Sequence, residues 1–193
     1  MTPFEPTVIH TDRLTLRWLG AADAPALFTI FSDPEVMRYW STPPVADMAQ
    51  VERTLAAVQI AYADGSSMRL GIVRSEDEAL VGTCTVFDVQ AGNRRAEIGY
   101  ALGRAHWGRG YMHEALEAFV DHLFGPLGLN RLEADIDPRN TASARTLQRL
   151  GFQQEGFLRE RWIVNGQVSD SALYGLLQRD WTQRPIAVRP TRA

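Results

Sequence analysis

Residues 99–116 read GYALGRAHWGRGYMHEAL, and this stretch decides the fold. An apolar run ends at Leu102, a loop with two glycines follows, and an amphipathic helix begins near Met112. Apolar residues then recur at helical spacing, at positions 112, 115, 116, 119 and 123. A strand, a glycine loop and a helix in this order point free backbone N–H groups, and the positive end of the helix dipole, at one place. The stretch therefore predicts a site for a phosphate-bearing ligand.

Two common phosphate sites are excluded by the loop itself. A P-loop needs Gly-Lys-Ser or Gly-Lys-Thr, and the sequence contains no lysine. A Rossmann fingerprint needs a third glycine where His113 stands.

The segments around the loop resemble the GNAT acetyltransferase superfamily. WGRGY at residues 107–111, EIGYAL at 97–102 and DPEVMRYW at 33–40 are similar to segments of its RimJ/RimL branch. The resemblance runs from about residue 10 to about residue 181. It implies an α/β fold with a central, mostly antiparallel sheet of about seven strands, which includes one splayed parallel pair and is flanked by helices.

Composition predicts one soluble globular domain over residues 1–183, with a loose tail over 184–193. No apolar run approaches a membrane span, and the first residues lack the pattern of a signal peptide, so we expect a cytoplasmic location and no membrane partner. The single cysteine excludes an internal disulfide. A net charge of −3 argues against a nucleic-acid partner.

Hydrophobic periodicity and turn residues place the other elements. We expect strands over 13–19, 68–74, 80–89, 95–102, 131–136, 155–164 and 169–177, and helices over 23–31, from 34, over 47–63, from 112 and over 142–150. Strand 95–102, the helix after it and strand 131–136 form a βαβ unit, so these two strands should be parallel neighbours.

The resemblance implies acetyl-CoA as the donor, with no metal. In this superfamily the acyl group moves directly from the thioester to an amine, and pantetheine inserts between the splayed strands. Carried over to this chain, the main chain of Tyr100, Ala101 and Leu102 faces pantetheine, and an N–H there stabilises the oxyanion. The pyrophosphate is held by the N–H groups of Trp107, Gly108, Arg109, Gly110, Tyr111 and Met112. Ala105 departs from the family pattern, because many members place Gln or Arg there.

Asn140 and Ser143 complete the cofactor residues that the resemblance implies. Asn140 stands where a helix N-cap is expected, and the family also uses an asparagine at this point to contact the cofactor. The two roles are compatible. Ser143 is placed near the sulfur or the pyrophosphate arm.

Glu97, Tyr100 and Ser143 are the candidate catalytic residues. Glu97 is either the general base or a strand carboxylate paired with Arg94 or Arg95, and the sequence does not decide between these roles. Leu147 stands where other members carry a tyrosine as general acid, so Tyr100, Ser143 or a water must protonate the thiolate.

The other polar and aromatic candidates can be explained by structural roles as well as by catalytic ones. We expect Asp135 to be a solvated rim charge, His106 a solvent-facing loop residue and Cys84 a small apolar strand residue. Asp170 either binds the acceptor or braces its loop. The aromatic residues Tyr39, Trp40 and Trp162 either line the acceptor pocket or pack in the core.

The leading interpretation is a RimJ/RimL-like N-acetyltransferase acting on a protein N-terminal α-amine. One alternative is an acetyltransferase for a small amine such as an antibiotic, a polyamine or an amino-acid-like metabolite. Another is a non-catalytic CoA-binding regulatory module. Only the acceptor half, roughly residues 23–65 and 155–170, would distinguish the two enzymes. A homodimer is common in this branch, and the exposed hairpin edges would permit one.

Overall fold

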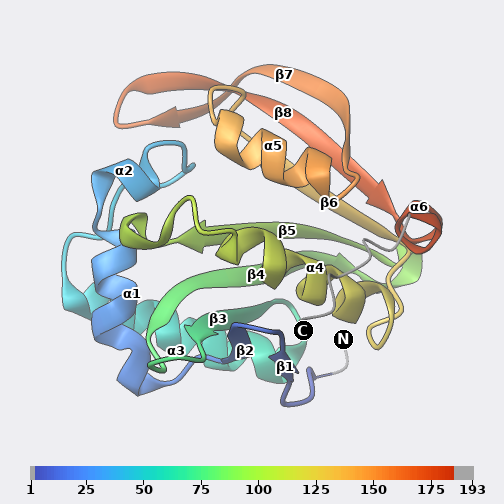
Figure 1. Cartoon of the computed structure of the whole chain (residues 1–193). Coiled ribbons are helices and arrows are strands. Elements are labelled where there is room, and N and C mark those ends of the chain that lie inside the picture. The colour runs from blue at the N-terminus through green and yellow to red at the C-terminus, as the bar shows by residue number, and fades with distance from the viewer. Residues whose placement is uncertain (1–2, 185–193) are drawn as a thin grey trace.

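An eight-stranded mixed sheet forms the centre of the protein (Figure 1). The computed structural model describes residues 3–184. The strands are β1 (Val8–His10), β2 (Leu14–Trp18), β3 (Met68–Arg74), β4 (Leu80–Gln90), β5 (Arg95–Leu102), β6 (Arg131–Ile136), β7 (Gln153–Val164) and β8 (Gln167–Leu177). They lie in the order β1-β2-β3-β4-β5-β6-β8-β7.

Helices cover both faces of this sheet (Figure 1). They are α1 (Ala24–Phe31), α2 (Pro34–Met37), α3 (Met48–Asp64), α4 (Tyr111–Phe124), α5 (Thr141–Arg149) and α6 (Gln178–Gln183). The apolar stripe of α4 is buried in the main core together with strand residues such as Leu70 and Leu132. α1 and α3 pack on each other through a second cluster that includes Leu27 and Leu55. No helix within residues 3–184 is long and apolar enough to span a membrane.

The parallel pair β5–β6 is short, and this shortness creates the site described below. Its register contains three pairs only, from Arg95↔Arg131 to Glu97↔Glu133. Beyond Glu97, β5 continues to Leu102 paired with β4 alone, and beyond Glu133, β6 continues paired with β8 alone. The two strands therefore diverge after Glu97 and leave a gap in the middle of the sheet.

The structure confirms the expected mixed sheet and the parallel neighbours, and adds elements that the sequence did not indicate. There are eight strands where about seven were expected, because β1 has three residues and an exposed Val8, too little for an alternating pattern. The six-residue helix α6 is also additional, and its buried Trp181 donates a hydrogen bond to Asp121. Of the tail expected over 184–193, residues 185–193 lie outside the described residues.

Candidate functional site

A cavity of about 300 Å³ lies where β5 and β6 diverge. Four of the residues singled out from the sequence line it together: Glu97, Tyr100, Asn140 and Ser143. β5 provides Glu97 and Tyr100, and the start of α5 provides Asn140 and Ser143. The break in the sheet thus brings these four residues to one place, although they are up to 46 positions apart in sequence.

The cavity connects the two faces of the sheet. Side chains alternate along a strand, so Glu97 and Gly99 face one side while Ile98 and Tyr100 face the other. Contacts agree with this: Tyr100 reaches Ser143 on α5, and a side chain at Gly99 would meet Phe87 on the opposite face. A reactant entering from the α5 face can therefore meet one entering from the face that carries Glu97.

Glu97 has the environment of a proton acceptor that works near neutral pH. Burial, together with the negative charges of Asp135, Asp88 and Glu133, raises its pKa to about 7, against a smaller opposite effect of Arg161. The alternative pairing of Glu97 with Arg94 or Arg95 is not found: Arg95 binds Glu133 and lies 3.6 Å from Asp88, and neither arginine forms an ion pair with Glu97. A carboxylate with a pKa near the working pH suits general base catalysis.

Tyr100 and Ser143 form a hydrogen-bonded pair on the other side of the gap. Their hydroxyl oxygens are 2.6 Å apart. Burial raises the pKa of Tyr100, so its hydroxyl remains protonated. Asn140 holds the start of α5, since its side-chain oxygen accepts a hydrogen bond of 3.1 Å from the backbone N–H of Ser143. The expected N-cap is therefore present.

The backbone of β5 points two N–H groups into the gap. The N–H of Gly103 donates to Val81 on β4, which fixes the alternation along the strand. The N–H groups of Gly99 and Ala101 then face β4, so the main chain of Ala101, which was expected to face pantetheine, is turned to β4. The N–H groups of Tyr100 and Leu102 point toward the diverging β6. The carbonyl of Leu102 accepts a 2.7 Å hydrogen bond from the Trp107 indole, which ties the strand end to the loop.

The loop after β5 has the geometry of an anion site. Gly108 and Gly110 have φ of 74° and 78°, a region that favours glycine, and Gly110 directly precedes α4. The N–H of Trp107, which was expected in the same set, donates to the carbonyl of Arg104 at 3.2 Å, whereas none of residues 3–184 accepts a hydrogen bond from the N–H groups of residues 108–112. These donors and the positive end of the α4 dipole are available to a phosphate.

β7 contributes to the cavity through a bulge that no local sequence pattern indicates. The register between β7 and β8 shifts between Leu158 and Trp162, and Glu160 has a φ of 52°. This bulge directs Arg161 to the cavity, where it lies 3.8 Å from Asp135. The expectation of a solvated rim charge at Asp135 is wrong, because its side chain is only 13% exposed.

Asp170 braces this bulge. Its carboxylate accepts a 2.7 Å hydrogen bond from the backbone N–H of Glu160, which decides for bracing over acceptor binding in this structure. Tyr39, Trp40 and Trp162 line the cavity.

Three other expectations concern residues outside the reaction. Cys84 is fully buried, and burial raises its pKa, as expected of a small apolar strand residue. Leu147 is fully buried in α5 and provides no acid. His106 is half-buried, and burial lowers its pKa.

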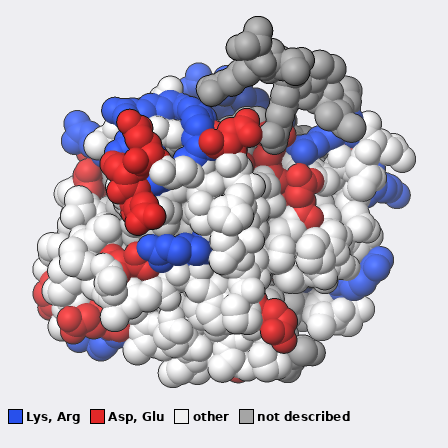
Figure 2. All heavy atoms as spheres, turned by 60° about the horizontal axis from the view of Figure 1, so that its bottom comes forward, with Lys and Arg blue, Asp and Glu red and all other residues white. Residues whose placement is uncertain are grey.

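The distribution of charged residues and of potential metal ligands indicates no further site. On the face drawn in Figure 2, charged residues of both signs are scattered around a broad uncharged area, so its described residues form no continuous basic patch. Within residues 3–184, no group of three or more His, Cys, Asp or Glu side chains is arranged to hold a metal ion.

Comparisons with known proteins agree with this geometry. The model of the family described as "Acetyltransferase (GNAT) domain" matches residues 13–153. The chain is 38% identical over 173 residues to "Uncharacterized N-acetyltransferase p20" of Bacillus licheniformis, covering 90% of this chain and 97% of that protein. It is 28% identical over 181 residues to the ribosomal protein uS5-alanine N-acetyltransferase of Escherichia coli K12, covering 90% and 92%. The solved structure "Mycobacterium smegmatis RimJ in complex with CoA-disulfide" superposes with a TM-score of 0.85 at 24% identity, covering 95% and 93%.

Proposed function

This chain belongs to the GNAT acetyltransferase family, and we propose that it transfers an acetyl group from acetyl-CoA to the α-amine of a protein N-terminus. It is an acyltransferase with relatives in the RimJ/RimL branch. The observation that carries the proposal is the gap between β5 and β6, with Glu97 on one face of the sheet and the Tyr100–Ser143 pair on the other. The similarity to an enzyme that acetylates a ribosomal protein supports the N-terminal acceptor.

The donor side is assigned to the α4 and α5 face. The free N–H groups of residues 108–112 hold the pyrophosphate, and those of Tyr100 and Leu102 continue the sheet onto pantetheine and stabilise the oxyanion. Asn140 fixes α5, which places Ser143 beside Tyr100.

The chemistry follows from the positions of the side chains. Glu97 takes the proton of the acceptor ammonium and passes it to solvent, and the neutral nitrogen attacks the thioester carbonyl carbon. The attacking nitrogen then loses its second proton to Glu97. The C–N bond forms, the C–S bond breaks, and the leaving sulfur receives a proton from the Tyr100 hydroxyl. Tyr100 is in turn reprotonated through Ser143 and solvent.

A thiol-release assay with acetyl-CoA tests this function. The acceptor panel contains ribosomal-protein N-terminal peptides, polyamines, aminoglycosides and free amino acids. We expect turnover on the peptides. Turnover confined to a small molecule would overturn the N-terminal acceptor but retain the enzyme, and no turnover on any amine would overturn the catalytic proposal.

A CoA titration tests the phosphate loop separately. We expect the double variant Gly108→Glu with Gly110→Glu to lose CoA binding, because carboxylates would occupy the anion site. Gly128→Glu is the matched control, since this glycine also has a positive φ and open space around it but follows the far end of α4. CoA binding in the double variant equal to that in wild type would contradict the assigned loop.

A further inference from the structure

Arg69 is a cation without an anionic partner among residues 3–184. It lies on β3, where its Nε donates a 3.1 Å hydrogen bond to Thr85 Oγ1 and its guanidinium lies 6.0 Å from the ring centre of Phe31. Burial lowers the pKa of Arg69. Among residues 3–184, no carboxylate forms an ion pair with it, and no atom accepts a hydrogen bond from its two terminal nitrogens. Arg69 is partly buried, and a guanidinium partly removed from water is stabilised by an anion that compensates its charge.

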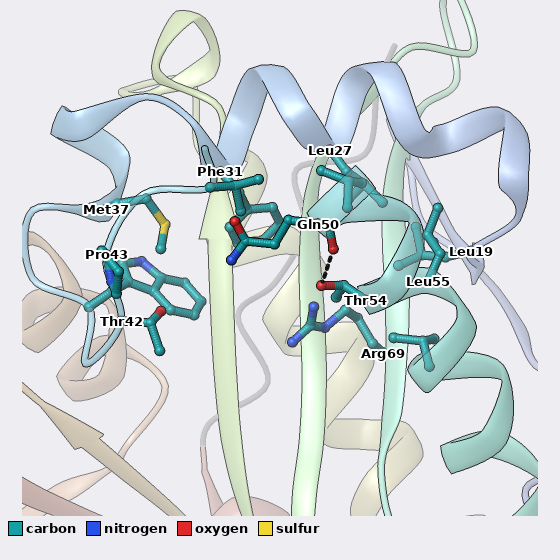
Figure 3. Close-up of a pocket in the computed structure, with 14 residues that line it drawn as sticks. Leu19, Leu27, Phe31, Met37, Thr42, Pro43, Gln50, Thr54, Leu55 and Arg69 are labelled. Carbon is teal, nitrogen blue, oxygen red and sulfur yellow. Dashed lines mark hydrogen bonds between the residues drawn. The ribbon is translucent and has the colours of Figure 1, made fainter. Parts of the chain in front are cut away.

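The terminal nitrogens of Arg69 face a cavity. This second cavity has a volume of about 350 Å³, of the order of small-molecule sites, and lies between α1, α3 and β3. Figure 3 shows the guanidinium pointing into the space bordered by Gln50 and Thr54 of α3. The rest of the lining is mainly apolar and includes Leu27, Phe31 and Met37. One cation in an apolar cavity matches a ligand with one negative charge.

The cavity lies beside the proposed reaction centre. The register pairs Arg69 with Thr85 and Thr85 with Gly99, so all three share the sheet face of Glu97. Two strand spacings place the Cα of Arg69 about 10 Å from that of Gly99. The bond to Thr85 draws the guanidinium toward β5. Trp40 lines both cavities and thus marks their common wall.

We propose that Arg69 binds a carboxylate of the acceptor, so that the acceptor class is an amine with a carboxylate about 6–10 Å away. This rests on the proposed function, because the amine must reach Glu97. A carboxylate is favoured over a phosphate dianion because a single guanidinium forms two parallel hydrogen bonds with it and leaves no second charge unpaired. Free α-amino acids reacting at the α-amine are excluded, since their two groups are too close together.

Matched acceptors test the proposal in the full-length protein. One pair is 6-aminohexanoate and 6-aminohexanamide, and the other is alanylalanine and its C-terminal amide. In wild type we expect KM for each acid to be about tenfold lower than for its amide. Arg69→Met should remove this preference by raising KM for the acids, while KM for the amides and kcat change less than about twofold. Calorimetric titration of the same acids in the presence of CoA measures binding without turnover.

Two further sets of variants control the result. Arg53→Met removes an exposed arginine of α3 outside the cavity and should keep the preference for acids. Thr54→Glu places a carboxylate in the cavity and should abolish the preference, whereas Thr54→Gln should keep it. If Arg69→Met does not fold, the two Thr54 variants still test whether Arg69 binds the acceptor carboxylate.

The role of Arg69 and the acetylation of amines are tested by different outcomes. Equal KM for acids and amides in wild type, or equal effects of Arg69→Met on both, would overturn the role of Arg69 while amine acetylation stands. Absence of calorimetric binding of both acids would overturn it too. Loss of the function itself would appear as absence of turnover on every amine in the panel.

Discussion

The hydroxyl of Tyr100 on β5 lies 2.6 Å from the Oγ of Ser143 on α5, so the two candidate proton donors form one unit. The unit lies on the sheet face opposite Glu97, and all three side chains line the cavity between the diverging strands. Proton removal from the acceptor and proton delivery to the leaving group are thereby assigned to opposite sides of the gap. This separation prevents direct proton transfer from the Tyr100–Ser143 pair to Glu97.

Tyr100→Phe should lower kcat by about 10- to 100-fold, because it removes the proton donor and keeps the ring. The free energy of unfolding should fall by only about 1 kcal/mol, as one hydrogen bond is lost. Thiol release at saturating donor measures kcat. Ser143→Ala is the companion variant, and the double variant should be no slower than the slower single, because the hydroxyls act together. Multiplicative losses would show that the two groups act independently.

Glu97→Gln should abolish the rise of activity with pH. In wild type, kcat/KM should increase through about pH 7, since the carboxylate with a pKa of about 7 must be deprotonated to accept the amine's proton. The variant should lose about 10²- to 10⁴-fold in kcat/KM at pH 8. Asp135→Asn should move the rising limb to lower pH, because one of the neighbouring negative charges that raise the pKa of Glu97 is removed. If the rise of kcat/KM with pH does not move in Asp135→Asn, the rise reports the titration of the acceptor amine or of another residue.

The same pKa shift predicts a stability effect of Glu97. A carboxyl whose pKa is raised in the folded state stabilises the fold below its unfolded pKa, near 4.5, and this contribution is lost as pH rises through about 7. Glu97→Gln should therefore be more stable than wild type at pH 8, by about 1–2 kcal/mol after allowance for solvent screening, with the difference disappearing at pH 4. Urea denaturation at the two pH values measures it. If the variant is less stable than wild type at pH 8, the charged Glu97 carboxylate does not destabilise the fold as its raised pKa predicts.

Asn140→Ala should cost about 1 kcal/mol of stability, because α5 loses its N-cap acceptor. Asn140→Asp keeps the acceptor and should keep the stability. CoA titration separates the second role that family resemblance implies for this residue. If the amide nitrogen contacts the cofactor, CoA affinity falls in both variants, and unchanged affinity in Asn140→Asp would restrict Asn140 to capping.

The sequence was sufficient for the parts of the site that depend on local order. Alternating strand residues, the glycine loop and the apolar stripe of α4 predicted the βαβ unit and the parallel neighbours that the register confirms. These features depend on contacts between residues close in sequence, or on a periodicity that burial imposes.

The sequence was insufficient where the contacts are distant or irregular. Arg69 stands between the buried residues Met68 and Leu70 and looks like the solvent-facing member of an alternating strand. Only the packing of α1 and α3 over β3 shows that it is partly covered and that no carboxylate of residues 3–184 pairs with it. Arg161 likewise reaches the cavity through a bulge with a positive φ at Glu160, a conformation that no local pattern announces.

Glu114 connects the N-terminal strands to the phosphate loop. Its carboxylate accepts hydrogen bonds from Thr11 Oγ1 at 2.6 Å and from Arg13 N and Nε at 2.8 and 2.7 Å. Arg13 also donates a 3.0 Å hydrogen bond to the carbonyl of Arg109 within the loop. Burial acts to raise the pKa of Glu114, but the hydrogen bonds from Thr11 and Arg13 outweigh it and hold the pKa below its usual value.

Glu114→Gln should weaken CoA binding about 3- to 10-fold and lower stability by about 1–2 kcal/mol at pH 7, since Arg13 loses the charge that orients it. A carboxyl with a depressed pKa stabilises the fold above its unfolded pKa, and this contribution is lost as pH falls through the folded pKa. The stability difference between wild type and variant should therefore shrink toward about pH 3. Urea denaturation at the two pH values and a CoA titration measure both effects. Glu117→Gln, one turn along α4, is the control; its carboxylate pairs with Arg184 at 3.5 Å between partly exposed side chains, so its loss should leave CoA binding unchanged and lower stability by less than about 1 kcal/mol. If Glu114→Gln loses stability but binds CoA like wild type, then Glu114 supports the fold without positioning the loop.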